Sequence, residues 1–412
     1  MGAEIRADLG AVKSPRWWRA FLPEIVCGTI AVVVSVRGLI KATPAFNNFD
    51  IFRHAFGHLV HGANLYALDA ANHVDYFKYS PAFALFMAPF WWLPRALGLL
   101  IWNLANALAP CLATRALGLS SRAVLFVLLF TLPELTIAVQ NAQSNGLVLG
   151  AMLGAFAALE RKRPVLAGFL IAFGCVIKPF VIVMAVCGVF HPRRRRFGLA
   201  LVGFLAALGI SPVLVQGFWG LVECHGSWLA RLASDRPNRF NISLMSFLQT
   251  HTGLVMPTWL YLPLGGLLLL VPLFRRAHWE RARFRLCAAA SVLMWVVLFN
   301  HKSESPTYVI AAYGVALWGV AAPRSWPRVM LLAGFFVLTE LASTDLIPRP
   351  VRQTYLQPHQ LKVLPLILIW LTLVFESMRR PVILGHWRAF RTSGQPRAAR
   401  KPRVREKFAR PV

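Results

Sequence analysis

Residues 164–190 read PVLAGFLIAFGCVIKPFVIVMAVCGVF, an apolar run with a single charge, Lys178, followed directly by a proline. The run lies between two basic clusters, RKR at 161–163 and RRRR at 193–196. Basic loops of membrane proteins stay on the cytoplasmic side, so both ends of this run are expected on the same side of the bilayer. The run is too short for two full spans of about 20 residues each. It therefore predicts two short helices that meet at Lys178-Pro179, near the far side of the membrane.

Apolar runs of similar kind recur along the chain, in which 57% of the residues are hydrophobic and 15% are charged. A run of about 20 such residues is long enough to cross a bilayer as a helix. The qualifying stretches are 17–40, 96–117, 121–139, 144–160, 197–216, 257–274, 284–300, 305–322, 327–346 and 362–379. With the broken segment at 164–190, they predict an all-α polytopic membrane protein with about 12 transmembrane helices.

A shorter aromatic stretch, PAFALFMAPFWWLP at 81–94, fits neither a span nor a solvated loop. We interpret it as a re-entrant or interfacial element. Its residues Phe90, Trp91 and Trp92 are candidates for stacking on a sugar, although an anchor in the aromatic belt of the interface is the commoner role.

The net charge of +28 follows the topology of a membrane protein, because most Lys and Arg fall in the tails and alternate loops assigned to the inside. This bias predicts cytoplasmic termini in a bacterial-type inner membrane and an integral-membrane domain over 1–379. The tail 380–412 is expected to be disordered and attracted to membrane lipids; nucleic acid is not an expected partner. The six scattered cysteines indicate neither a disulfide framework nor a cysteine metal site. Function is expected on the outer side, in a first loop at 41–80 and a large loop at 217–256.

The first outer loop begins with FNNFDIFRHAFGHLVHGANLY at 46–66. Its apolar residues recur at helical spacing and its polar residues fall on the opposite face of that helix. This pattern predicts an amphipathic interfacial helix on the outer membrane surface. The polar face carries Asp50, His54, His58 and His61. This spacing is compatible with metal ligands, to which Asp69 and Asp75 would add. We favour the other interpretation, in which the histidines lie on the solvated face of an interfacial helix.

Several motifs in order resemble glycosyltransferase family 87, integral-membrane mannosyl- and arabinosyl-type transferases that use polyprenyl-phosphate sugars. The entry segment at 49–94 matches at Asp50, Gly62, Tyr66, Tyr79, Pro81, Leu93 and Pro94. QNAQSNG at 140–146 is similar to a Gly-Gln-x-Asn segment with Ala142 in place of glycine, and NRFNISL at 238–244 is similar to an Asn-x-Ser-Leu loop. At 299–311 the chain reads FNHKSESPTYVIA, which departs from the family pattern and leaves the acceptor and the sugar open.

The resemblance implies a type-C-like fold, no cofactor, and inverting transfer from a polyprenyl-phosphate sugar to a lipid or glycan acceptor. It places the catalytic base at Asp50, with Glu304 as the alternative base. The other reading of Asp50 is an ion pair with Arg53 or a helix N-cap.

Cations for the donor phosphate are predicted from residue type and position, because charge-assisted hydrogen bonds favour phosphate. Lys178 is the strongest candidate, since a lysine at membrane depth needs an anion, a wet cavity or a route to the interface. The full set is Lys178, Arg53, Arg239 and Lys302, with Arg236 also on the outer side; some are expected to be only solvated. The candidates for sugar or acceptor contacts, or for helix caps, are Tyr66, Tyr79, Gln143, Asn145, Asn241 and Glu304.

Three other classes compete with a transferase. A transporter or lipid flippase is expected to show paired broken helices, whereas the sequence shows one, at Lys178-Pro179. A non-catalytic scaffold leaves the polar residues of the outer loops unexplained. A metal-dependent enzyme built on the histidines is expected to be sensitive to chelation.

Overall fold

The computed structural model describes residues 21–40, 46–235, 241–321 and 325–379, and all regular elements within them are helices. The first half of the chain forms α1 (Leu22–Ile40), α2 (Asn47–Val60), α3 (Pro81–Phe86), α4 (Ala88–Trp92), α5 (Arg95–Ala116), α6 (Ser121–Phe130), α7 (Leu132–Gln140), α8 (Asn145–Glu160), α9 (Pro164–Ile177), η3 (Pro179–Ala185), α10 (Val186–Val189), α11 (Arg194–Ile210) and α12 (Val213–Ser234).

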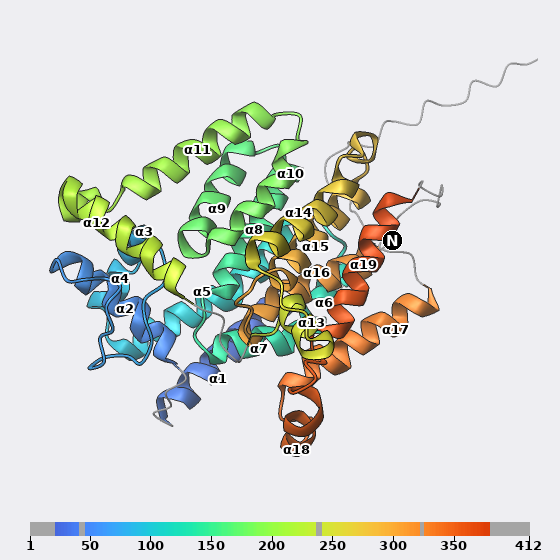
Figure 1. The fold of residues 1–412 in the computed structure, drawn as a ribbon, viewed down its shortest axis with the longest axis horizontal. Coiled ribbons are helices and arrows are strands. Elements are labelled where there is room, and N and C mark those ends of the chain that lie inside the picture. The colour runs from blue at the N-terminus through green and yellow to red at the C-terminus, as the bar shows by residue number, and fades with distance from the viewer. Residues whose placement is uncertain (1–20, 41–45, 236–240, 322–324, 380–412) are drawn as a thin grey trace, which may run out of the picture.

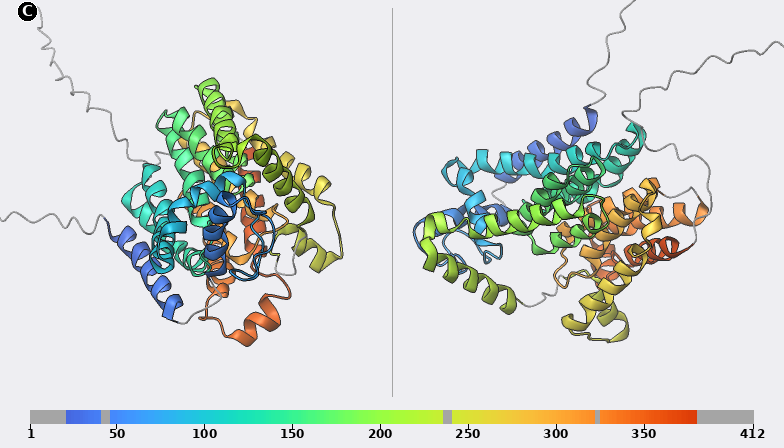
Figure 2. Two further views of the ribbon diagram at one scale, coloured as in Figure 1. Left: turned by 90° about the vertical axis from the view of Figure 1, so that its left-hand side faces the viewer. Right: turned by 90° about the horizontal axis from the view of Figure 1, so that it is seen from above.

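The second half begins with α13 (Leu244–Thr252) and ends with α19 (Leu364–Met378). Between them lie α14 (Thr258–Leu273), η4 (Arg276–His278), α15 (Ala282–Leu298), η5 (Ser305–Thr307), α16 (Tyr308–Ala321), α17 (Trp326–Phe335), η6 (Phe336–Glu340), η7 (Leu341–Ser343), α18 (Arg349–Val351) and η8 (Arg352–Leu356). Most helices of the first half lie on the left of Figure 1 and most of the second half on the right, while α6 of the first half packs against α16 of the second (Figures 1 and 2).

Among the described residues, three helices are long and apolar enough to cross a membrane: Leu22–Ile40, Arg95–Ala116 and the continuous helix Trp326–Ser343. Two bent pairs also qualify, α6 with α7 at 50° and α11 with α12 at 90°, and several shorter apolar helices accompany them. Each stretch predicted as a span contains a helix, so the all-α prediction is confirmed for the described residues. The number of about 12 spans stays a prediction. The predicted tail at 380–412 lies outside the described residues.

The broken segment at Lys178-Pro179 is confirmed. α9 ends at Ile177, Lys178 is extended with φ −137° and ψ 114°, and Pro179 opens the 3₁₀ turn η3. A β-carbon on Gly174 would lie 2.7 Å from Cγ1 of Val181. Residues seven apart in a straight helix are about 10 Å apart along its axis, so the chain folds back here.

Close helix packing rests on small residues. α5, α8, α9 and α11 lie side by side in that order (Figure 1). A β-carbon on Gly146 of α8 would lie 2.0 Å from the backbone oxygen of Asn106, and one on Gly150 would lie 2.6 Å from Cβ of Ala109. These glycines let α8 approach α5 at backbone distance, as small residues do in membrane helix pairs.

The amphipathic helix predicted in the first outer loop is present as α2, but protein covers its apolar face. Phe49, Phe52 and Leu59 are at most 1% exposed. Phe52 packs on Phe83 of α3 and Trp102 of α5, with ring centroids 5.3 and 5.4 Å apart. Protein therefore covers the apolar face of α2, which corrects the expectation that this face lies in lipid. The place of the helix at the outer membrane surface stays a prediction.

The segment predicted as a large outer loop at 217–256 is mostly helical. α12 continues to Ser234 after a kink at Gly217, whose φ of 66° is in the left-handed region that glycine adopts without strain. α13 follows, with Ser243 as its N-cap and Gly253 as its C-cap, at φ 70° and ψ 0° in the left-handed helical conformation.

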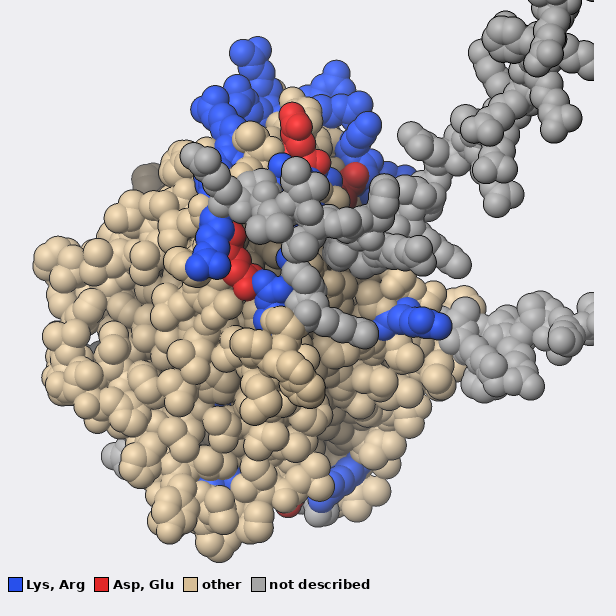
Figure 3. Space-filling view, turned by 90° about the vertical axis from the view of Figure 1, so that its right-hand side faces the viewer, with Lys and Arg blue, Asp and Glu red and all other residues tan. Residues whose placement is uncertain are grey.

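Basic residues gather at one end of the molecule, as Figure 3 shows for one face. Ion pairs join helix ends there: Arg285 of α15 donates two hydrogen bonds to Glu160 of α8, at 2.6 and 2.8 Å. A second pair joins Glu24 at the start of α1 to Arg115 at the end of α5. Ion pairs therefore join α8 to α15 and α1 to α5 at this end of the molecule.

Candidate functional site

The break after α9 places Lys178 against the start of α8. Its ammonium group donates a 2.7 Å hydrogen bond to Oδ1 of Asn145, which is fully buried. The Nδ2 group of Asn145 donates to the backbone oxygen of Pro306, at 2.9 Å. Two predicted site residues far apart in the sequence thus meet, and the segment around Glu304 lies next to them.

Glu304 belongs to this group by charge. Its carboxylate interacts electrostatically with Lys178 and with Tyr79. It precedes η5, so it enters from the second half of the chain while Lys178 enters from the first. The result is a polar centre at the junction of the two halves, with one lysine, one carboxylate and one buried amide.

Tyr79 and Ser80 hold the start of α3 against α9. Ser80 Oγ donates a 2.8 Å bond to the backbone oxygen of Val176, two residues before Lys178, and caps α3 by accepting from Phe83 N. The ring of Tyr79 lies edge-on to Phe52, with centroids 4.8 Å apart. Tyr66 is buried, and its hydroxyl donates to the backbone oxygen of Tyr79 at 2.9 Å. Tyr66 therefore helps to hold the backbone of Tyr79 in place.

The turn between α7 and α8 carries the Gln143 and Asn145 pair. Ala142 has a φ of 45°, in the left-handed region where glycine is unstrained, which is the position at which the family pattern has glycine. Its carbonyl accepts a 2.9 Å bond from Nε1 of Trp102. Oε1 of Gln143 is buried without a hydrogen-bond partner in the described part of the chain, so this amide is available to a ligand hydroxyl.

Asp50 lies on α2 in a bidentate ion pair with Arg95, the first residue of α5. Both carboxylate oxygens accept bonds of 2.7 Å from the guanidinium group. The Asp50 side chain is 15% exposed and that of Arg95 is 42% exposed. The alternative that Asp50 pairs with Arg53 is wrong, because Arg53 donates instead to backbone oxygens at the end of α4, those of Phe90 and Leu93, at 3.1 and 3.0 Å.

The aromatic residues of α4 divide between two roles. The Trp91 ring packs against α2, so closely that a β-carbon added to Gly57 would lie 2.5 Å from it. The same ring is edge-on to the His54 ring, with centroids 5.8 Å apart. Trp92 is 71% exposed, as an interfacial anchor would be.

The histidines of α2 contact the loop that follows it. His58 lies 3.1 Å from Oδ2 of Asp69, and His54 and His58 are each 6.4 Å from the buried His73 ring. His61 points its Nδ1 to the backbone oxygen of Gly57. Burial lowers the pKa of His54 below its ordinary value, which favours the neutral ring. No group of three or more ligating side chains suited to a metal ion occurs among the described residues.

Lys302, the remaining predicted cation within the described residues, lies at the end of α12. Lys302 forms an ion pair with Asp235, and Lys78 lies 3.6 Å from the other oxygen of that carboxylate. Burial and the charge of Lys302 lower the pKa of the neighbouring His301. Arg236 and Arg239 lie outside the described residues. Asn241 is buried, donates to Ser243 Oγ at 3.2 Å, and has an Oδ1 with no partner in the described ranges.

The sequence reasoning missed a second polar centre around Lys362. Its ammonium group donates to Glu134 Oε1 and Ser343 Oγ, both at 2.7 Å, and to Ser305 Oγ at 2.8 Å. Glu134 and Glu340 are fully buried. The sequence contained a signal for this centre: Glu134 interrupts the apolar run at 121–139. Ionisable residues inside such runs are usually functional.

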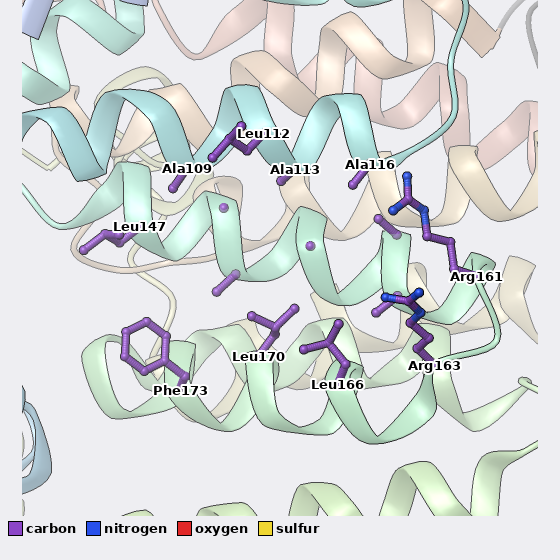
Figure 4. Close-up of a pocket in the computed structure, with 15 residues that line it drawn as sticks. Ala109, Leu112, Ala113, Ala116, Leu147, Arg161, Arg163, Leu166, Leu170 and Phe173 are labelled. Carbon is purple, nitrogen blue, oxygen red and sulfur yellow. The ribbon is translucent and has the colours of Figure 1, made fainter. Parts of the chain in front are cut away.

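An apolar groove of about 370 Å³ runs between α5 and α9 over the surface of α8. Leu147 and Phe173 lie at one end, and Arg161 and Arg163 lie at the other (Figure 4). Leu147 follows Asn145 by two residues and Phe173 precedes Lys178 by five, so the first end opens beside the polar centre.

The comparison with protein families agrees with this layout. The family model of glycosyltransferase family 87 matches residues 77–299, more than half of the chain. The chain belongs to glycosyltransferase family 87. It is accordingly a glycosyltransferase with the apolar helices of a membrane protein, acting on a sugar donor and an acceptor. The matched region of this family 87 chain contains Tyr79, Asn145 and Lys178, whereas Asp50 and Glu304 lie outside it. A search of curated proteins gave no match.

Proposed function

We propose that this family 87 protein is an inverting glycosyltransferase that uses a polyprenyl-phosphate sugar at the outer face of the membrane. The transferred sugar is mannose or another hexose or pentose, and the acceptor is a lipid or a glycan. The observation that carries the proposal is Lys178. A lysine held by Asn145 at the end of an apolar helix, beside the opening of an apolar groove, matches a ligand with a phosphate head and a long hydrocarbon tail.

In this proposal the prenyl chain lies in the groove between α5 and α9. Its phosphate lies at Lys178, where a charge-assisted hydrogen bond stabilises the leaving group. The amides of Gln143 and Asn241, each with a buried oxygen that has no partner in the described residues, are placed to accept hydrogen bonds from sugar or acceptor hydroxyls.

The reaction needs one base and no cofactor. The acceptor oxygen attacks the anomeric carbon, the bond from that carbon to the phosphate oxygen breaks, and the electron pair stays on the phosphate. The base takes the proton of the acceptor hydroxyl, and the configuration at the anomeric carbon is inverted. We assign the base to Asp50, following the family resemblance, and assign to Arg95 the role of orienting its carboxylate.

Glu304 is the second candidate for the base, favoured by its electrostatic interaction with Lys178. The two candidates are separable by substitution of each carboxylate and of Arg95, the partner of Asp50. Asp50→Asn is expected to lower turnover about 10² to 10⁴-fold, the usual effect of losing a general base. Arg95→Met removes the same ion pair but leaves the carboxylate, so its loss is expected to be much smaller.

The experiment is to incubate the purified protein with polyprenyl-phosphate mannose, glucose and arabinose in turn, together with a membrane-lipid extract as acceptor. Mass spectrometry is expected to show one extract component gaining one sugar, with release of polyprenyl phosphate. Movement of the lipid-linked sugar across a vesicle membrane without any such product would instead establish a flippase. If Glu304→Gln abolished transfer and Asp50→Asn did not, the base would be Glu304.

A further inference from the structure

The centre around Lys362 lies between three parts of the chain that are distant in sequence. Its ammonium group has three N–H donors, and each has an acceptor: Glu134 of α7, Ser305 of η5 and Ser343 of η7. The same group lies 4.5 Å from the centre of the Tyr308 ring. Lys362 is 8% exposed, so its position is determined by these partners and not by solvent.

Burying these charges is costly, which makes stability a weak explanation for them. Replacing a buried ion pair by apolar residues of similar size is often neutral or stabilising. Here the cost is increased by Glu340, which is fully buried and accepts a 3.1 Å bond from the backbone N–H of Glu134. The best attested use of buried ion pairs is to fix one arrangement of the chain among several.

The Lys362 centre holds the segment Ser305-Pro306, which leads to the proposed donor site. Ser305 is bound by Lys362, and the next residue, Pro306, accepts the hydrogen bond from Asn145. Asn145 in turn accepts the hydrogen bond from Lys178. A continuous path of short contacts therefore joins the buried pair to the cation proposed to bind phosphate.

The other side of this segment is held as well. The backbone oxygen of Ser303 accepts a 2.7 Å bond from Ile242 N, and Tyr308 donates a 3.0 Å bond to the oxygen of Ile242. Ile242 thus holds residues on both sides of Ser305, and Lys362 supplies the contact at Ser305 itself.

We propose that Glu134 and Lys362 are positioning residues for the donor site. They hold Ser305 and Pro306 so that the amide of Asn145 aims the Lys178 ammonium group at the donor phosphate. This inference rests on the proposed function and adds to it two residues that do not touch the substrate. It predicts an effect on donor KM more than on kcat, because the base and the reacting atoms are unchanged.

The test uses a double variant, Glu134→Gln/Lys362→Met, in the full chain. Lys362→Met alone leaves Glu134 buried without its counter-ion and is expected to fold poorly. The double variant removes both charges at similar volume and is expected to fold, as checked by size-exclusion chromatography and thermal unfolding. Its donor KM is expected to rise about tenfold, with kcat within about threefold of the wild type. The matched control is Glu160→Gln/Arg285→Met, which removes an ion pair at the basic end and is expected to leave the donor KM unchanged.

A mutant cycle separates positioning from a general structural defect. In a Lys178→Met background, the double variant is expected to add no further rise in donor KM, because its effect acts through Lys178. An unchanged donor KM in the folded double variant, or an equal additional rise in the Lys178→Met background, would overturn the inference while leaving the proposed function intact. A wild-type protein that transfers sugar from none of the polyprenyl donors would overturn both.

Discussion

Replacement of Lys178 by methionine tests the proposed donor site most directly. Methionine has a similar length and no charge, so the variant removes the ammonium group and keeps the packing of the chain break. The donor phosphate loses one charge-assisted hydrogen bond, worth about 1.5 to 3 kcal/mol. At about 1.4 kcal/mol per factor of ten, the donor KM is expected to rise about 10- to 150-fold.

The stability of the variant is expected to change less than its donor binding. Asn145 Oδ1 loses its donor in a fully buried position, which costs about 1 to 3 kcal/mol. The variant also removes a partly buried ammonium group, whose desolvation is costly, and this offsets part of that cost. Thermal unfolding with and without donor measures the two effects separately, since only the bound form reports on phosphate contact.

The assay measures initial rates against donor concentration for the wild type, Lys178→Met and a matched control, Lys162→Met. Lys162 is an exposed lysine in the turn between α8 and α9, at the opposite end of the same helices, and its replacement is expected to leave kinetics unchanged. A well-folded Lys178→Met protein with wild-type donor KM would refute the phosphate role and return Lys178 to a lysine that reaches toward the interface.

Three further predictions concern the supports of the site. Gly154→Phe places a ring in the groove, because a β-carbon on Gly154 would meet only Cδ1 of Leu170, at 3.3 Å. The KM for donors with a long prenyl chain is expected to rise, whereas the KM for a donor with a short prenyl chain is expected to stay unchanged. Gly146→Ala puts a methyl group 2.0 Å from the backbone oxygen of Asn106, and a loss of about 1 to 3 kcal/mol is expected in chemical denaturation. Ala142→Gly is expected to stay within about 1 kcal/mol of the wild type, because relief of the positive φ offsets the lost methyl contacts; destabilisation by more than about 2 kcal/mol would show that the turn needs the methyl group.

The sequence was sufficient for the features that depend on local pattern. The basic clusters flanking 164–190 and the proline after Lys178 predicted a fold-back that the structure contains. The spacing of Phe49, Phe52 and Leu59 predicted helix α2 and its apolar face. Periodicity identifies which face of a helix is apolar, but it contains no information about whether lipid or protein covers that face. The expectation that lipid covers the apolar face of α2 was wrong for this reason.

The sequence allowed candidate site residues to be selected, but not the contacts that they make with one another. Tyr79, Asn145, Lys178 and Glu304 were selected individually, and the structure brings them together at the junction of the two halves. The partners of other residues depend on contacts that no local pattern encodes. Arg95 lies 45 positions from Asp50, and Lys362 lies 228 positions from Glu134. An unexplained charge inside an apolar run, as at Glu134, is the only trace that such a partner leaves in the sequence.

The distribution of polar groups also bears on the choice between a transferase and a flippase. A carrier that alternates between two faces needs polar sites that can be exposed to each side in turn. In the described residues the break at Lys178, the buried amide of Asn145 and the Glu134–Lys362 pair are joined by hydrogen bonds into one fixed network, which contacts both halves of the chain. Such a network resists the relative motion of the halves, because moving them would separate buried charges. A rigid centre of this kind suits a reaction whose leaving group must be held at one place, which favours a transferase over a flippase.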